Sequence, residues 1–145
     1  MITKEFILAG KAIFTIDVPV SYQEQEGMKS HYTYKVNFKK GDGYYADAYF
    51  INLLTGPDNT NDYTYLGMLV NDGIRLTNKS PWDMKSWPVM LLRRSIQHIW
   101  NGTTDKIIQA GFDIHHVGRC GRCGKPLTTH ESIMSRIGPI CAKKA

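Results

Sequence analysis

Hydrophobic and polar residues alternate along two stretches in the first third of the chain. Apolar side chains occupy every second position from Ala12 to Val18 and again from Tyr32 to Phe38. A period of two is typical of a strand with one buried face. Residues 21–30 between these stretches are polar and include a glycine, so we expect a loop there.

The pattern then predicts three further strands. Tyr44 to Leu54 is apolar on both faces, which favours a central strand after the turn at residues 41–43. The segment Thr55 to Asp62 is polar and is typical of a turn-rich loop, although its Asp and Asn side chains could also bind a ligand or a cation such as Ca²⁺. Tyr63 to Val70 and Ile74 to Thr77 follow as strands, and the Asp-Gly pair at 72–73 suits a type I′ hairpin turn.

One long helix is predicted after the strands. Ser80-Pro81-Trp82-Asp83 resembles a helix start, and apolar residues recur at a spacing of three to four up to Trp100. Pro88 lies inside this stretch, so it either kinks a helix from about Asp83 to Trp100 or places the true start nearer Trp87. Asn101-Gly102 ends the helix, and a further short strand could lie at residues 112–114.

Composition supports a globular α+β protein. The chain has 145 residues, 42% hydrophobic and 21% charged, which argues against wholesale disorder. We predict an antiparallel sheet of about five strands with one long helix in residues 1–106, and a C-terminal zinc-binding module in residues 107–145. No apolar run reaches the roughly 18 residues of a membrane span, and no signal peptide precedes the first strand, so we expect a protein of the cytoplasm.

Three cysteines lie within the last 26 residues. Cys120 and Cys123 form a Cys-x-x-Cys pair among glycines, and Cys141 follows a Gly-Pro turn. An odd, clustered set is a poor disulfide framework, whereas thiolates at this spacing converge readily on a tetrahedral zinc ion. A structural zinc needs a fourth ligand, and the spacing leaves His115, His116 and His130 as candidates.

A redox pair and a catalytic zinc are the two alternatives to a structural zinc at these cysteines. A redox Cys-x-x-Cys usually begins a helix after a strand, and this one lies among glycines. A catalytic zinc would need an open position and a general base, and Glu131 is better explained as the partner of Thr128 in a capping box. We therefore predict no enzymatic activity.

The net charge lies in the same segment. The chain carries +5, and basic and acidic residues are equal in number up to residue 114. Residues 115–145 contain six basic residues and a single acid, Glu131. Four of the basic residues lie in or near the zinc motif: Arg119, Arg122, Lys125 and Arg136. Such side chains can bind phosphates of a nucleic acid, or they can simply keep the surface solvated. The aromatic sheet could also stack bases, although aromatic residues at alternating positions are more often core.

The C-terminal motif resembles an uncharacterised family, a domain of unknown function found largely in bacteriophages and their hosts. The residues that carry the resemblance are His116-x-Gly118-Arg119-Cys120-Gly121-Arg122-Cys123-Gly124-Lys125, then Ile137-Gly138-Pro139-x-Cys141. The resemblance places a histidine at position 116 and often a proline at 130. It therefore implies the ligand set Cys120, Cys123, Cys141 and His116.

Two functions remain as hypotheses. The first is a small zinc-binding accessory protein of a phage that binds nucleic acid through its basic zinc segment in the host cytoplasm. The alternative is an anti-defence inhibitor that binds a host protein or a nucleotide signal, and only the resemblance to phage proteins supports it.

Overall fold

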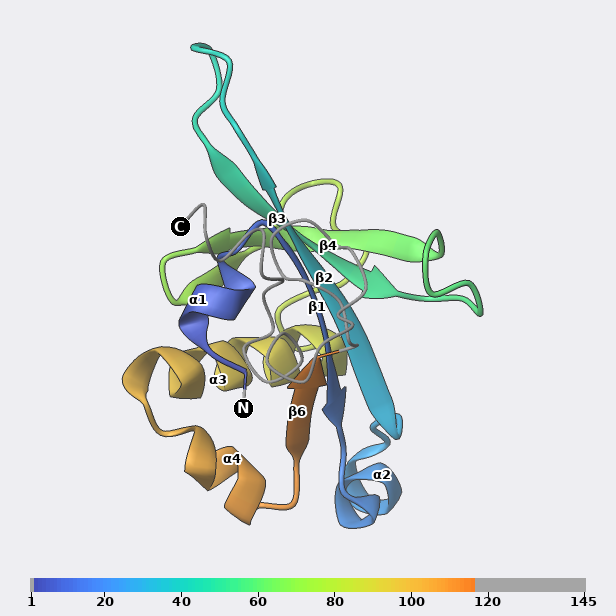
Figure 1. Cartoon of the computed structure of the whole chain (residues 1–145). Helices are drawn as coiled ribbons and strands as arrows, with labels where there is room; N and C mark the ends of the chain where they lie inside the picture. The colour runs from blue at the N-terminus through green and yellow to red at the C-terminus, as the bar shows by residue number, and fades with distance from the viewer. Residues whose placement is uncertain (1, 117–145) are drawn as a thin grey trace.

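Six antiparallel strands form one curled sheet with helices against one of its faces (Figure 1). The computed structural model describes residues 2–116. The elements along the chain are α1 (Lys4–Ile7), β1 (Lys11–Asp17), α2 (Val20–Glu26), β2 (His31–Lys39), β3 (Ala48–Leu54), β4 (Tyr63–Val70), β5 (Gly73–Arg75), α3 (Trp87–Asn101), α4 (Thr104–Gln109) and β6 (Asp113–His116). This architecture confirms the predicted α+β class.

The strands lie in the order β5-β4-β3-β2-β1-β6. Strands β1 to β5 each pair with the next strand along the chain, with α2 in the connection between β1 and β2. Strand β6 instead returns from the end of the described chain to pair with β1 at the sheet edge. In β4, Leu66 is an extra residue, because Ile51 pairs with Gly67 while Asn52 pairs with Tyr65. A bulge of this kind increases the local twist of a sheet.

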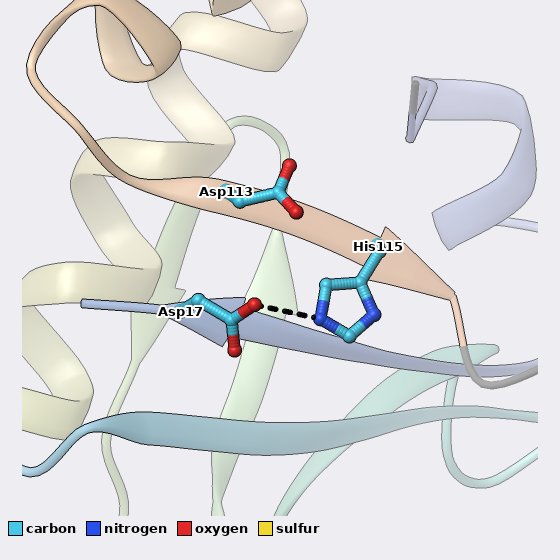
Figure 2. Close-up of side chains that lie close together, drawn as sticks. All are labelled: Asp17, Asp113 and His115. Atoms are coloured by element: carbon cyan, nitrogen blue, oxygen red, sulfur yellow. Dashed lines mark hydrogen bonds and ion pairs between the residues drawn. The ribbon is translucent and has the colours of Figure 1, made fainter. Parts of the chain in front are cut away.

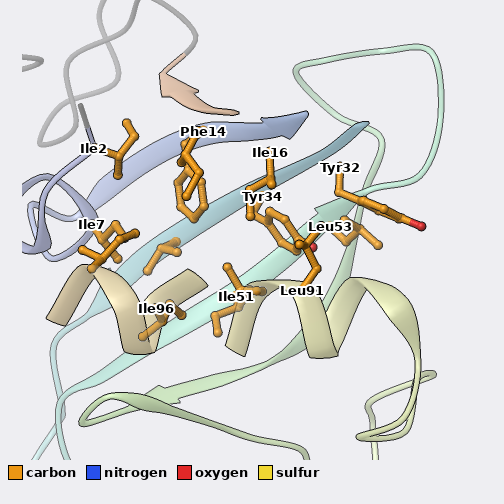
Figure 3. Packing of buried hydrophobic residues seen from close by; sticks show 14 of the residues in the cluster. Ile2, Ile7, Phe14, Ile16, Tyr32, Tyr34, Ile51, Leu53, Leu91 and Ile96 are labelled. Carbon is orange, nitrogen blue, oxygen red and sulfur yellow. The ribbon is translucent and has the colours of Figure 1, made fainter. Parts of the chain in front are cut away.

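The core lies between one sheet face and the helices (Figure 3). Phe14, Tyr34 and Ile51 come from three neighbouring strands and are fully buried. Their rings and methyl groups meet Phe6 of α1 and Ile96 of α3 in a single cluster. Burial of such a side chain stabilises the fold by about 1.5–3 kcal/mol, so this face accounts for most of the packing energy.

Helix α3 is amphipathic and packs along the sheet. Its buried residues recur at three-to-four spacing and include Leu92, Ile96 and Ile99. Of the two predicted starts, the one nearer Trp87 is confirmed and the one at about Asp83 is wrong. Ser86 is the N-cap and Pro88 stands in the first turn, where a missing N–H costs nothing. Asp83 instead accepts hydrogen bonds from Lys85 and Ser86 in the preceding turn.

Three other predictions are corrected. The sheet has six strands rather than about five, since residues 113–116 pair with β1. The predicted loop at residues 21–30 instead holds most of α2, which buries none of its side chains. Strand β3 begins at Ala48 and not at Tyr44, because Asp42 and Asp47 accept backbone hydrogen bonds that fold residues 41–47 into a hairpin tip.

The hairpin turns differ in detail from the sequence pattern. Asn71 and Asp72 are the two turning residues between β4 and β5, and Asn71 has the positive φ of 56°. Gly73 is the first residue of β5. The β2–β3 hairpin extends away from the body of the molecule (Figure 1) and exposes Tyr44 and Tyr45 at its tip.

The segment after α3 belongs to the same packed unit. Ile107 of α4 and Ile114 of β6 both join the core cluster. The domain boundary predicted after residue 106 falls within α4. Among residues 2–116, none of the helices has the length and apolarity needed to cross a membrane.

Candidate functional site

Strand β6 places the predicted zinc ligand His116 on the covered side of the sheet. His116 pairs with Phe14 of β1, whose side chain points into the core. The His116 ring lies 6.2 Å from the ring of Phe6 in α1, tilted by 53°. His116 is therefore half-buried at the end of the described chain, four residues before Cys120.

The neighbouring histidine points the other way. Side chains alternate along a strand, so His115 lies on the opposite face from His116. His115 Nε2 lies 3.0 Å from Asp17 Oδ2 in β1 (Figure 2), and both side chains are about half exposed. The two adjacent imidazoles cannot approach the same ion from a regular strand, which separates His115 from His116 as candidate ligands.

Asp113 completes a small polar cluster around His115. Asp113 and Asp17 are directly opposite each other across the β1–β6 pair, and like charges in such positions are destabilising. One ligand-type atom from each of Asp17, Asp113 and His115 lies within 4.8 Å of the others (Figure 2). The imidazole hydrogen bond to Asp17 offsets part of that repulsion.

The other predicted site residues lie outside the described residues. They are the three cysteines Cys120, Cys123 and Cys141, the alternative ligand His130, and the basic residues Arg119, Arg122, Lys125 and Arg136. Their spatial relation to His116 therefore stays a prediction.

The sheet face opposite the core carries no helix in the described part of the chain. The buried apolar side chains of α1, α3 and α4 all join the core cluster, and α2 buries none. We call this surface the open face and define it by the outward residues of β1 to β5. One cross-strand row consists of Lys11, Asn37, Phe50, Met68 and Arg75. The neighbouring row consists of Ile13, Lys35, Asn52 and Tyr65, and Tyr63 lies beyond it, paired with Leu54.

Aromatic rings occupy the middle of the open face. Phe50 and Tyr65 lie with ring centroids 6.2 Å apart, and neither ring is fully buried. Tyr65 is held in place by a 3.2 Å hydrogen bond between its hydroxyl and that of Thr77. The Lys35 ammonium lies 5.1 Å from the centroid of the Tyr63 ring, a distance at which a cation is attracted to the ring face.

Cations surround these rings. Lys11 and Arg75 are exposed at the two ends of the first row, and Lys39 is exposed on β2. Among the outward strand residues in the described range, the acids are Asp17 and Asp113, both at the β6 side. The open face therefore combines partly exposed rings with an excess of positive charge.

In the loop Thr55 to Asp62, the acidic side chains accept hydrogen bonds from the loop itself. Asp58 Oδ1 accepts from the backbone N–H groups of Thr60 and Asn61, and Asp62 Oδ2 accepts from Asp58 N at 2.8 Å. The Thr60 N–H and the Asn61 side chain lower the pKa of Asp58. These bonds describe a self-contained turn, in line with the turn interpretation of this segment.

The comparisons with known proteins concern the C-terminal segment. A family of unknown function, DUF6011, matches residues 113–145, which begin with strand β6. No curated protein and no solved structure matches the chain. The match covers less than a quarter of the sequence and carries no activity.

The sequence pattern suggested that the aromatic sheet could stack bases, but it did not show which cations lie beside the rings. The alternation of Lys35, Asn37 and Lys39 with buried residues was visible, but the alignment of Lys11 and Arg75 with Phe50 depends on strand register. The Asp17–His115 pair joins residues 98 positions apart, and no local pattern signals it.

Proposed function

We propose that this protein binds single-stranded nucleic acid on the open face of its sheet, with the basic residues after β6 as a second contact. The observation that carries the proposal is the row in which Lys11 and Arg75 flank Phe50. Five strands at about 4.8 Å spacing make this row about 19 Å long. That length lets several nucleotides lie across the sheet.

Each part of the row has a role in such a complex. A base stacked on Phe50 contributes about 1–3 kcal/mol and requires no particular sequence. Lys11, Lys39 and Arg75 are exposed and can approach backbone phosphates, which releases condensed counterions. Stacking selects unpaired bases, because a duplex hides its base faces.

The C-terminal residues extend the same proposal. Cys120, Cys123, Cys141 and His116 would hold one structural zinc ion and order the segment that carries Arg119, Arg122, Lys125 and Arg136. Metal binding to such a short segment supplies folding free energy. The half-buried position of His116 beside Phe6 supports this ligand, since a fixed ring orientation favours metal binding.

Fluorescence anisotropy with a labelled 20-nucleotide single strand tests the nucleic-acid proposal. We expect binding that weakens steeply with salt, and a salt slope reduced by about one for Lys11→Ala and for Arg75→Ala. Phe50→Leu, which keeps an apolar side chain, should weaken binding roughly tenfold through lost stacking.

Lys85→Ala is the matched control. Lys85 is exposed just before α3 on the helix side, so its loss should leave the affinity unchanged. Absence of binding at low salt would reject the proposal. An equal effect of Lys85→Ala and Lys11→Ala would show that the open face is not the site, and a preference for duplex would contradict stacking.

Metal analysis by mass spectrometry tests the zinc site separately. We expect one zinc per chain, lost in Cys120→Ser and in His116→Ala. His115→Ala should retain the metal, because its ring lies on the opposite face. Retention of zinc by His116→Ala together with loss in His130→Ala would assign the fourth ligand to His130 instead.

A further inference from the structure

A second candidate site lies among the helices. A pocket of about 420 Å³ opens between α2, α3, α4 and the start of β6. Pockets that bind small molecules have volumes of about 300–1,000 Å³. This one is separate from the open face, because helix residues form most of its walls.

The walls are largely apolar. Trp87 and Leu91 come from one stripe of α3, and Ile107 of α4 contributes to the same lining. Phe112 closes one side, with its ring 5.0 Å from that of Tyr22 in α2. Leu91 and Ile107 are each 8% exposed, so the apolar lining is part of the packed body and not a loose surface.

Two cations border this apolar space from different helices. Arg94 of α3 and Lys106 of α4 both line the pocket and are exposed. Within residues 2–116 neither side chain forms an ion pair. His98, on the same stripe of α3, is oriented by a 2.8 Å hydrogen bond between its Nδ1 and Thr103 Oγ1.

One acid limits what the pocket can accept. Glu26 of α2 is the acidic residue in the lining. A carboxylate there repels a second negative group on a ligand. The charge pattern therefore fits a molecule with a single anionic end and disfavours a polyanion such as a nucleic-acid backbone.

We propose that this pocket binds a small amphipathic anion. Its apolar body lies between Trp87 and Ile107, and its single carboxylate, sulfonate or phosphate group lies at Arg94 and Lys106. Charge complementarity selects this ligand class, and the apolar walls supply most of the buried area. The proposal is independent of nucleic-acid binding on the open face.

A matched pair of fluorescent probes tests it on the full chain. 8-Anilinonaphthalene-1-sulfonate carries a sulfonate on an aromatic body, and N-phenyl-1-naphthylamine has the same body without the charge. We expect saturable binding of one sulfonate probe per chain, at least tenfold tighter than the neutral probe. Equal affinities, or no saturable binding of the sulfonate probe, would overturn the proposal.

Variants then locate the probe. Arg94→Ala combined with Lys106→Ala should weaken the sulfonate probe at least tenfold and change the neutral probe less than twofold. Both side chains are exposed, so the fold should persist. Ala110→Trp, which fills the pocket from its exposed edge, should weaken both probes.

Lys11→Ala combined with Arg75→Ala is the control for charge. It removes two exposed cations from the open face and should leave both probes unaffected. If this control weakens the sulfonate probe as much as the pocket variant does, or if Ala110→Trp leaves its affinity unchanged, the probe binds elsewhere and the proposal is wrong.

Discussion

The hydroxyl of Tyr34 joins the sheet to the first turn of the long helix. Tyr34 is fully buried in β2, and its hydroxyl donates a 2.7 Å hydrogen bond to the carbonyl oxygen of Pro88. The Pro88 carbonyl is 54 residues away in sequence. This single bond therefore fixes where α3 begins relative to the core.

Removing that hydroxyl should be costly. Tyr34→Phe keeps the ring and removes a hydrogen bond to the partly buried carbonyl of Pro88, so we expect a loss of about 0.5–1.5 kcal/mol in the free energy of unfolding. Urea denaturation measures it. Tyr49→Phe is the control, because Tyr49 bonds Leu8 from a half-buried position and should lose less. An equal or larger loss for Tyr49→Phe would contradict this account.

The same residue predicts a response to high pH. Burial, with a smaller contribution from Tyr32, raises the pKa of Tyr34 well above its usual value near 10. Above pH 10 the unfolded chain releases this proton while the folded chain retains it, so stability falls as pH rises. The urea midpoint should decline as pH rises above about 10, and Tyr34→Phe should flatten the decline. Parallel declines in the two proteins would refute the assignment.

The facing carboxylates Asp17 and Asp113 predict a stabilising substitution. Asp113→Asn removes like-charge repulsion across β1 and β6 while keeping the Asp17–His115 hydrogen bond. We expect a gain of about 0.5 kcal/mol, measured by urea denaturation with EDTA present. Asp17→Asn, which also weakens the bond to His115, should gain less. A clear loss for Asp113→Asn in EDTA would mean that the pair is not repulsive.

At the scale of elements, the ends of the helices show how backbone conformation limits the sequence. Gly102 ends α3 with φ of 71° and Gly27 ends α2 with φ of 70°, and a Cβ at either position would meet nothing within 4 Å. Any cost of a side chain there comes from left-handed backbone strain alone.

Two matched substitutions separate local strain from global stability. Gly102→Ala should lower the free energy of unfolding by about 1–2 kcal/mol, because α3 is anchored in the core and cannot relax. Gly27→Ala should lower it less, since α2 buries no side chain and can fray at little cost. Equal losses in thermal or urea unfolding would show that α2 is coupled to the core as tightly as α3.

Local patterns predicted the elements whose burial repeats regularly. The period of two found β1 and β2 nearly to the residue, and the apolar stripe found most of α3. Helix α2 was missed because none of its side chains is buried, so no period marks it. The open face needed strand register, which sets Lys11, Phe50 and Arg75 in one row through contacts far apart in sequence.

At the scale of the molecule, the open face carries an excess of positive charge although the first 114 residues have no net charge. Up to residue 114 basic and acidic residues balance, yet the outward residues of β1 to β5 hold four cations, Lys11, Lys35, Lys39 and Arg75, and one acid, Asp17. A body that is neutral overall can therefore still attract a polyanion to one side.

The position of β6 predicts a truncation phenotype. A chain that ends at residue 111 loses the partner of β1 and the buried Ile114, which leaves an unpaired strand edge open to other chains. We expect dimers or larger species in size-exclusion chromatography. A chain that ends at residue 116 keeps the pairing and should elute as the smaller species; identical profiles would contradict the role given to β6.

The pairing of β1 with β6 also sets an order of events during synthesis. The ribosome makes the outer partner of β1 only after about a hundred further residues. Throughout translation the backbone groups along that edge stay available to neighbouring nascent chains. Closely spaced ribosomes on one message are therefore the setting in which this protein is most exposed to misassembly, and slower initiation should raise its soluble yield.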